Sequence, residues 1–383
     1  MTLVQTILDV FKKHFDGRPL LVRSPGRVNL LGEHTDYNMG FVLPAAIDRA
    51  IYFALSRRGD RLCRVMAANL GQEIEFAIDR VSQSQLGWPN YLMGVVDQFN
   101  KNGLEISGFN CVFGGDIPLG AGLSSSAALG AGLAFALNLQ NHLGIHPLAL
   151  VKLAQKAENE FVGVQCGIMD QYINIFGSKG HVLRIDCRSL ENMPLPFDYD
   201  HVALVLFNTN LPHSLAFTEY NQRRRECAAG VAAIREQFPQ VNSLRDVSRA
   251  MLNACQEQMA EALFRRCRYV VGENERMIQA GKDLNGRDLR SFGRLMFETH
   301  AGLRDDFQVS CAELDHLVEL VQNDPQVYGA RMMGGGFGGC TINLIETEAV
   351  ERVSAKIKAK YSARFGCEPA VYVTSIAAGT AVL

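Results

Sequence analysis

The chain has 383 residues, of which 48% are hydrophobic and 20% are charged, and its formal net charge is −2. This length favours two domains, and the composition is that of a globular protein with enough apolar residues for two cores. The small net charge gives no strong field for nucleic acid or an anionic membrane surface, so both partners are disfavoured.

Signals for targeting, membrane insertion and metal binding are weak. The first residues do not form a basic segment followed by an apolar one, so we expect no secretory signal. The longest apolar run, residues 127–137, is shorter than a bilayer requires. Ten cysteines without a C-x-x-C pair fit free thiols in a reducing cytoplasm. His142 and His146 lie four residues apart, but Pro147 follows at once, which favours a loop over a metal site.

The first half of the chain is predicted to mix strands and helices. Residues 3–15 carry apolar side chains at helical spacing and predict an amphipathic first helix. Apolar runs bounded by turn residues predict strands at 20–36, 40–56, 64–67, 73–78 and 109–113. Longer apolar segments predict helices at 91–100, 123–139, 147–161 and 169–176.

The second half is predicted to be mostly helical up to residue 323. Strands are expected at 181–187, 202–208, 340–345 and 370–373, and a helix at 348–361 with Thr347 as its N-cap. The proline-containing segment 192–199 is predicted to be irregular and marks the expected boundary between domains 1–195 and 196–383. Because no regular βαβ order is present, we predict an α+β protein.

The segment 24–37 combines many polar side chains with an apolar frame. It contains Arg27, Glu33, His34 and Asp36 around two leucines that favour burial. Buried polar groups need hydrogen-bond partners, and the hydroxyls of a small polyhydroxylated ligand can supply them. By itself this segment leaves a ligand-binding loop and a surface loop equally open.

A second segment, residues 118–127, places two glycines before three serines at the start of an apolar helix. Glycine lets the backbone approach a ligand closely, and a helix N-terminus offers N–H groups and a positive dipole end to phosphate. The segment lacks the lysine of a Walker A loop and the third glycine of a dinucleotide-binding motif. A simple serine N-cap is the alternative, but three serines favour an anion site.

Two further segments are notable, one for its carboxylates and the other for its glycines. Glu158 and Asp170 flank a glycine-containing turn, a pattern suited to Mg²⁺ ligation and proton abstraction. Taken alone, a solvated Glu158 and a capping Asp170 are the simpler interpretation. Five glycines within residues 334–339 lose much conformational entropy on folding, which indicates a packed loop rather than a linker.

Together these segments resemble the galactokinases of the GHMP superfamily of small-molecule kinases. Residues 25–36 resemble the galactokinase sugar signature, 118–127 the superfamily's phosphate loop and 334–339 its C-terminal glycine motif. The resemblance spans nearly the whole chain and implies a two-domain fold with mixed sheets and an active site in the interdomain cleft. It also implies ATP-dependent phosphorylation of galactose at its C1 hydroxyl, the first committed step of galactose utilisation.

The resemblance further implies a role for each matching residue. Asp170 would be the catalytic base, and Arg27 would keep it ionised and stabilise charge on the transferred phosphoryl group. The sugar would contact Glu33, His34, Thr35, Asp36 and Tyr220. The ATP phosphates would contact Gly120, Ala121, Gly122, Leu123, Ser124, Ser125 and Ser126. Ser126 and Glu158 would hold Mg²⁺. Separately from the resemblance, we expect the chain to be a monomer.

Two departures from the family pattern and two other functions stay open. Met39 lies in the turn after the sugar signature, and Met333 stands where a threonine commonly precedes the glycines. A non-catalytic sensor of galactose and ATP is disfavoured by the complete serine loop. Within the kinases, the Glu33 to Asp36 cluster disfavours mevalonate and homoserine as acceptors, whereas an N-acetylated galactose stays open.

Overall fold

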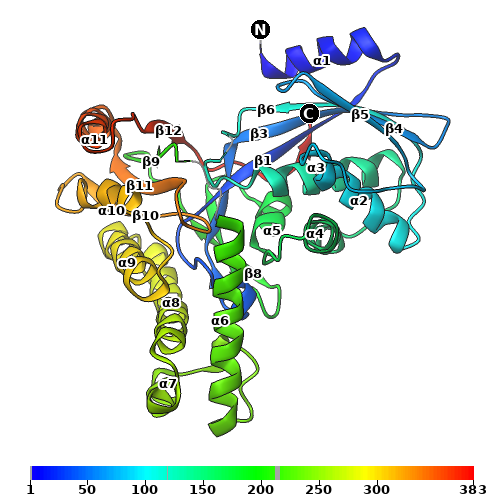
Figure 1. Ribbon diagram of the computed structural model, residues 1–383. Helices are drawn as coiled ribbons and strands as arrows, with labels where there is room; N and C mark the ends of the chain where they lie inside the picture. The colour runs from blue at the N-terminus through cyan, green and yellow to red at the C-terminus, as the bar shows by residue number, and fades with distance from the viewer. Residues whose placement is uncertain (1, 119, 212–215) are drawn as a thin grey trace.

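The structure is a computed structural model that describes residues 2–118, 120–211 and 216–383. Within these residues it contains sheets of six, four and three strands packed against helices (Figure 1), which confirms the α+β prediction. The sheet orders are β13-β1-β3-β6-β4-β5, β10-β11-β9-β12 and β2-β7-β8.

The first half of the chain supplies the six-stranded and three-stranded sheets and the helices around them. In order, its elements are α1 (Leu3–His14), β1 (Leu20–Asn29), η1 (Asp36–Asn38), β2 (Phe41–Val42), β3 (Pro44–Arg57), β4 (Leu62–Ala67), β5 (Gln72–Ala77), α2 (Pro89–Lys101), β6 (Phe109–Gly115), α3 (Ser125–Gln140), α4 (Pro147–Lys156), the π-helix η2 (Ala157–Val162), α5 (Met169–Phe176), β7 (His181–Asp186) and β8 (Asn192–Pro196).

The second half supplies the four-stranded sheet and most of the remaining helices. Its elements are β9 (Val202–Asn208), α6 (Ala216–Gln237), η3 (Leu244–Asp246), α7 (Arg249–Ala254), η4 (Gln256–Gln258), α8 (Glu261–Asn285), α9 (Leu289–Gly302), the π-helix η5 (Leu303–Phe307), α10 (Ala312–Glu319), β10 (Val327–Met332), β11 (Cys340–Glu346), η6 (Thr347–Ala349), α11 (Val350–Phe365), β12 (Ala370–Thr374) and β13 (Ala381–Val382).

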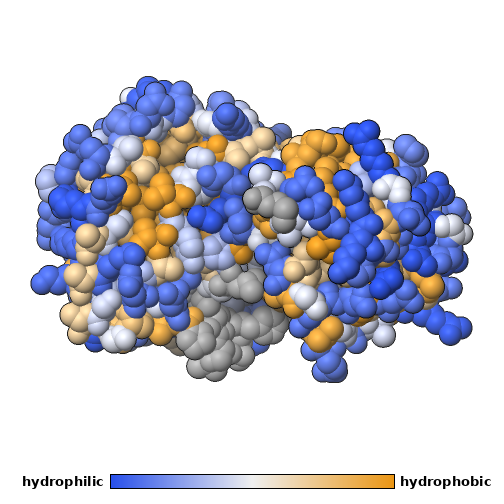
Figure 2. Space-filling view, turned by 90° about the horizontal axis from the view of Figure 1, so that it is seen from above, coloured by the Kyte–Doolittle hydropathy of each residue, from blue (hydrophilic) through white to orange (hydrophobic). Residues whose placement is uncertain are grey.

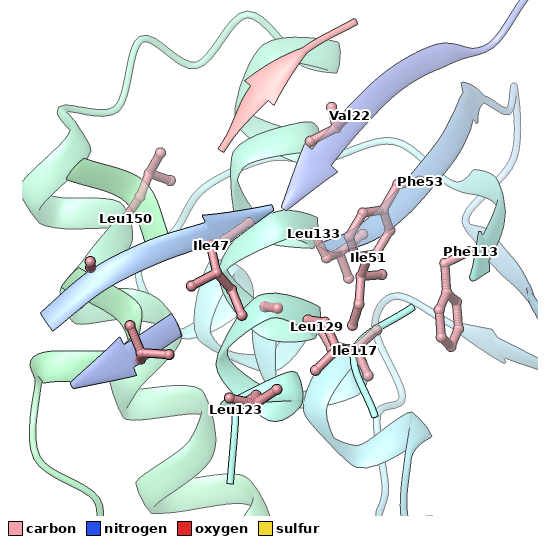
Figure 3. Close-up of a cluster of buried hydrophobic side chains, with 14 of the residues drawn as sticks. Val22, Ile47, Ile51, Phe53, Phe113, Ile117, Leu123, Leu129, Leu133 and Leu150 are labelled. Atoms are coloured by element: carbon pink, nitrogen blue, oxygen red, sulfur yellow. The ribbon is translucent and has the colours of Figure 1, made fainter. Parts of the chain in front are cut away.

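The six-stranded sheet is covered on both faces. Successive side chains of a strand point to opposite faces, so in β3 Ala54 packs with Phe11 of α1, while Phe53 joins the main core with Leu133 of α3 (Figure 3). Gly132 permits this close packing, because a Cβ at that position would lie 2.6 Å from both Phe53 and Ser24. The small residues of α3 therefore bring the helix, and the serines at its start, directly onto β1.

A buried hydrogen-bond network fixes α5 to the same strand. Asn174 Nδ2 donates to Ser24 Oγ at 2.9 Å, and Ser24 Oγ donates to the Ala128 carbonyl of α3 at 2.7 Å. Thr380 Oγ1 donates to Asn174 Oδ1 at 2.7 Å. The network holds β1, α3 and α5 in fixed relative positions, and these three elements carry Arg27, the serines and Asp170.

Several details of the predicted secondary structure were wrong. The strand predicted at 20–36 ends at Asn29, and the helix predicted at 147–161 changes to a π-helix at Ala157. The segment 192–199, predicted to be irregular, contains β8, which pairs with β7. Thr347 does not cap α11, because the chain first makes the short 3-10 turn η6 from Thr347 to Ala349.

The two halves of the chain share a core. Leu204 and Leu206 of β9 and Met277 of α8 lie in the same buried cluster as Phe53, whereas Val205 and Phe207 face a second cluster with α11. β13, close to residue 383, pairs antiparallel with β1 and completes the six-stranded sheet. The division into domains 1–195 and 196–383 stays a prediction, and β8 continues to Pro196 across it.

The surface shows no single dominant apolar area in the view from above. Hydrophobic residues lie in separate patches between hydrophilic ones (Figure 2). Within the described ranges, none of the helices has both the length and the apolar character needed to cross a bilayer.

Candidate active site

Two neighbouring cavities bring the sequence motifs together. The first, of about 380 Å³, contains the sugar signature and is lined in part by Glu33, His34, Asp36, Glu158, Gly167 and Tyr220. The second, of about 310 Å³, lies between the phosphate loop and the C-terminal glycine segment and is lined in part by Gly120, Gly122, Leu123, Ser124, Ser125, Gly336 and Gly339. Both volumes are in the range of small-molecule sites. The residues common to both are Arg27, Ser126, Asp170, Gly334 and Gly335.

Arg27 and Asp170 form a two-point ion pair where the cavities meet. Arg27 Nε donates to Asp170 Oδ1 at 2.8 Å and Nη2 donates to Oδ2 at 2.9 Å. Burial opposes the charge of Arg27, but Asp170 and Glu33 more than offset it and raise the pKa of Arg27. The register of β1 against β3 shifts just before Arg27, and such irregularities commonly redirect a side chain. The geometry of the pair is therefore fixed, and Arg27 keeps its positive charge.

The phosphate loop reaches Asp170 through Ser124. This residue is the N-cap of α3, but it has a left-handed backbone with φ of 57° and makes no capping bond with its side chain. Its hydroxyl donates instead to Asp170 Oδ2. The arrangement differs from a simple serine N-cap, and it leaves the N-terminus of α3 facing the second cavity.

His34 is a neutral ring at one side of the first cavity. Its Nδ1 lies 2.7 Å from the hydroxyl of Tyr37, and its ring packs against Tyr220 and Phe307 at centroid distances of 5.4 and 4.8 Å. Burial, with Arg223 and Arg331 nearby, lowers the pKa of His34 to about 3. Its Nε2 is buried and has no hydrogen-bond partner among the described residues, so it is available to a ligand hydroxyl.

Asp36 is held close to a glycine from a distant part of the sequence. Its Oδ1 accepts the backbone N–H of Tyr37 at 2.9 Å. A Cβ at position 167 would lie 1.7 Å from Asp36 Oδ2, so only glycine at position 167 leaves room for this carboxyl. The glycine at 167 is thus part of the geometry of the sugar signature.

The carboxyl of Asp36 makes the stability of the ligand-free protein depend on pH. Burial raises the pKa of Asp36 to about 7, with Asp170 and Glu33 adding to the shift. Since the folded state holds this proton more tightly than the unfolded chain, the contribution of Asp36 is most favourable at acid pH and is lost between pH about 4 and about 7. We expect Asp36→Asn to raise the calorimetric Tm of the ligand-free protein by a few degrees at pH 8 and by less than half as much at pH 5. The same Tm change at both pH values would contradict this.

Two of the predicted contact residues do not line either cavity. The Thr35 hydroxyl is buried between two carbonyl acceptors, that of Gly32 at 2.7 Å and that of Phe41, to either of which it can donate its one proton. Ala121 is also buried, whereas its neighbours Gly120 and Gly122 line the second cavity. These positions shape the turn and the loop, and the geometry does not favour direct contacts with sugar or phosphate.

Ser126 and Glu158 fit a magnesium site that is completed by phosphates. Glu158 lies in the π-helix η2, a rare element that often occurs at functional sites. Burial and the charge of Asp170 raise the pKa of Glu158 to about 7, although the hydroxyl of Ser126 and the amide of Gln171 oppose the shift. The described residues contain no cluster of three or more His, Cys, Asp or Glu side chains that forms a complete metal site. Mg²⁺ commonly uses one or two carboxylates together with substrate phosphates, which matches this donor set.

The structure adds residues that the sequence did not identify. Arg331 and Gly334 contact the carboxylate of Glu33, and Tyr269 donates its hydroxyl to the Glu33 carbonyl at 3.0 Å. Met333, which stands where the family commonly has a threonine, is buried, and its sulfur accepts the backbone N–H of Asn29 at 3.5 Å. The glycine cluster was a signal for the segment around Gly334, but nothing in the local sequence pointed to the arginine and the tyrosine.

Family models match three parts of the chain. Residues 9–57 match the galactokinase galactose-binding signature, residues 90–178 the N-terminal domain of GHMP kinases and residues 277–363 their C-terminal domain. These ranges contain the sugar signature, the phosphate loop with Glu158 and Asp170, and the glycine segment.

Curated relatives and solved structures agree with these models. A galactokinase of Roseiflexus sp. is 46% identical over 95% of this chain and 93% of its own chain. Human galactokinase is 42% identical over 97% of this chain and 95% of its own chain. The crystal structure of Lactococcus lactis galactokinase complexed with galactose superposes with a TM-score of 0.95 at 34% identity, covering 100% of both chains. A mevalonate kinase structure, at 16% identity and a TM-score of 0.64 over 93% and 99% of the two chains, shares the fold alone.

The sequence identity extends over almost the full length of both curated relatives, and the galactose-binding signature contributes Arg27, Glu33, His34 and Asp36 to the first cavity. The chain therefore belongs to the galactokinase family of GHMP kinases and, as a sugar kinase, phosphorylates galactose with ATP.

Proposed function

We propose that the chain transfers the γ-phosphoryl group of ATP to the C1 hydroxyl of galactose at the junction of the two cavities. The observation that carries this proposal is the Arg27–Asp170 pair, which lines both the cavity of the sugar signature and the cavity of the phosphate loop. An acceptor hydroxyl in the first cavity and a phosphoryl group in the second would both be next to this pair. Phosphoryl transfer depends mainly on such positioning and on charge stabilisation.

Asp170 is the proposed base for the acceptor hydroxyl. Its two oxygens are oriented by Arg27 and Ser124, so one carboxylate oxygen can accept the C1 proton while the arginine stays paired with the group. Arg27 would also face the transferred phosphoryl group, and its positive charge would stabilise the negative charge that spreads over the phosphoryl oxygens.

Ser126 and Glu158 are the proposed magnesium ligands, and the start of α3 is the proposed phosphate site. When bound, Mg²⁺ would neutralise charge on the β- and γ-phosphates. The N-terminus of α3 and the backbone of Gly120 and Gly122 would surround the same phosphates. Ligation of a cation favours the ionised form of Glu158, so binding of Mg²⁺ would lower the pKa that burial raises to about 7.

The sugar would be recognised by groups with complementary hydrogen-bonding roles. Glu33 and Asp36 would accept from sugar hydroxyls, and the neutral His34 would use its unpartnered Nε2. Tyr220 of α6 lines the cavity beside the ring of His34. An ADP-release assay with galactose and N-acetylgalactosamine tests the acceptor assignment. Turnover of galactose at a higher kcat/KM supports it, and a preference for the N-acetylated sugar would overturn it.

Replacement of Glu33 tests the sugar site directly. We expect Glu33→Ala to raise the calorimetric Kd for galactose at least tenfold, because a charged hydrogen-bond acceptor is lost, and to change the Kd for ATP about threefold or less. An unchanged affinity for galactose would exclude the role proposed for Glu33.

We further propose a reducing compartment, the cytoplasm, and a monomeric state. The first rests on ten cysteines that are all free thiols. The second rests on the fact that both cavities are built from elements of one chain, so catalysis requires no second copy. Sedimentation equilibrium at assay concentrations tests the monomer, and a stable dimer under those conditions would contradict it.

A further inference from the structure

Arg331 is a fully buried cation on β10 that does not line either cavity. Its Nε donates to the Leu30 carbonyl at 2.7 Å, its Nη1 to the Met332 carbonyl at 2.6 Å and its Nη2 to the Asn29 carbonyl. Two of these three acceptors belong to the sugar signature, which is 300 residues away in the sequence. A strand of the second half thus holds the backbone that leads into the first cavity.

The same guanidinium fixes the carboxylate of Glu33. Glu33 Oε1 accepts from Arg331 Nη1 at 3.2 Å and from Nη2 at 3.1 Å, and it also accepts the backbone N–H of Gly334 at 2.8 Å. All three donors lie within residues 331–334, and all three bonds use the same carboxylate oxygen. Glu33 nevertheless lines the first cavity.

We propose that Arg331 is a positioning residue for galactose recognition, which orients the Glu33 carboxylate toward the sugar from outside the cavity. This inference rests on the proposed role of Glu33 in sugar binding. Arg331 does not touch the reacting atoms, so it acts on the affinity for galactose and not on phosphoryl transfer itself.

An arginine is required here for a geometric reason. The planar guanidinium serves four acceptors at once, in directions that a lysine ammonium on a flexible stem cannot reproduce. The buried anion of Glu33 also needs a buried cation, because loss of one partner leaves an uncompensated charge. The glycine segment that begins at Gly334 lines both cavities, so the anchored carboxylate also connects the sugar signature with the phosphate side.

The test uses the full-length protein and compares galactose with ATP. For Arg331→Lys, we expect the calorimetric Kd and the KM for galactose to rise roughly tenfold or more, since a small misplacement of a binding group has a large effect. We expect the KM for ATP and the kcat at saturating galactose to change about threefold or less. This split distinguishes positioning from a general loss of folded protein.

A matched control removes buried hydrogen bonds from the neighbouring strand. Asn343 on β11 is fully buried, pairs in register with Ala330, and donates to the Val205 carbonyl at 3.1 Å and to Thr341 Oγ1 at 3.0 Å. Asn343→Ala should lower the Tm without changing the Kd for galactose. If it weakens galactose as much as Arg331→Lys, the effect is one of stability and the proposal is overturned.

A second comparison separates this inference from the role of Glu33. In the Glu33→Ala background, Arg331→Lys should weaken galactose by no more than about threefold, much less than in the unaltered chain, because the carboxylate through which Arg331 acts is already absent. A further large loss in the double variant overturns the proposal. If Glu33→Ala weakens galactose but Arg331→Lys does not, only the positioning role fails. If Glu33→Ala has no effect on galactose, both assignments fail.

Discussion

Asp170→Asn is expected to lower kcat by roughly 10³-fold while galactose still binds, because the variant keeps the shape of the side chain but cannot accept the C1 proton. Arg27 would lose its anionic partner, so a lower Tm is expected as well. The measurement is kcat from ADP release at saturating substrates, together with calorimetric titration of galactose. Turnover near that of the unaltered protein would exclude Asp170 as the base.

Asp324→Asn is a matched control for this variant. Asp324 is also paired with an arginine through both oxygens, since Arg352 Nη1 and Nη2 each donate to it at 2.8 Å. This pair lies outside both cavities. The control should lose some stability and retain its kcat, which separates loss of the base from loss of an ion pair.

Gly167→Ala is expected to weaken galactose by about 10² in Kd, although it adds only one methyl group. The new Cβ would lie 1.7 Å from Asp36 Oδ2 and 2.2 Å from its Cγ, so the carboxyl of Asp36 must move. Displacement of a binding group by about 1 Å commonly has an effect of this size. Calorimetric titration with galactose measures it, and an affinity within threefold of normal would show that Asp36 is dispensable at its present position.

Gly130→Ala provides the control for this change. Gly130 lies inside α3, where a Cβ would be 3.9 Å from its nearest neighbour, a methyl group of Val95, and alanine is the better helix former. This variant should bind galactose normally and have an equal or higher Tm. The pair of variants therefore compares the same chemical change with and without contact to the sugar signature.

Helices and strands that are defined by a local apolar pattern were predicted accurately, and those that depend on pairing with distant parts of the chain were not. The helix 169–176 and the strand 202–208 were predicted with their observed bounds, because local apolar patterns define them. β8 was missed because Pro194 and Pro196 lack N–H groups, a feature that is tolerated here at the edge of the three-stranded sheet. β13 is two residues long and exists only through its pairing with β1, so it has no local signature.

The candidate site shows the same distinction. Arg27, Glu33, His34 and Asp170 were identified because they belong to dense local motifs, and the structure brings them to adjoining cavities. Arg331 was not identified, because a buried arginine acts through partners 300 residues earlier in the chain. Such long-range anchors follow from tertiary packing, and a reading of local motifs cannot find them.

The pairing of β13 with β1 has a consequence for synthesis of the protein. The strand that carries Arg27 pairs with β3 on one side and with residues 381–382 on the other. While the ribosome makes the intervening 350 or so residues, β1 is an open sheet edge, and such edges promote association between chains. The part of this edge at Val22 and Arg23 is therefore covered only after residues 381 and 382 have been made, whereas the partners of Arg27, Gly122 and Asp170, are made much earlier.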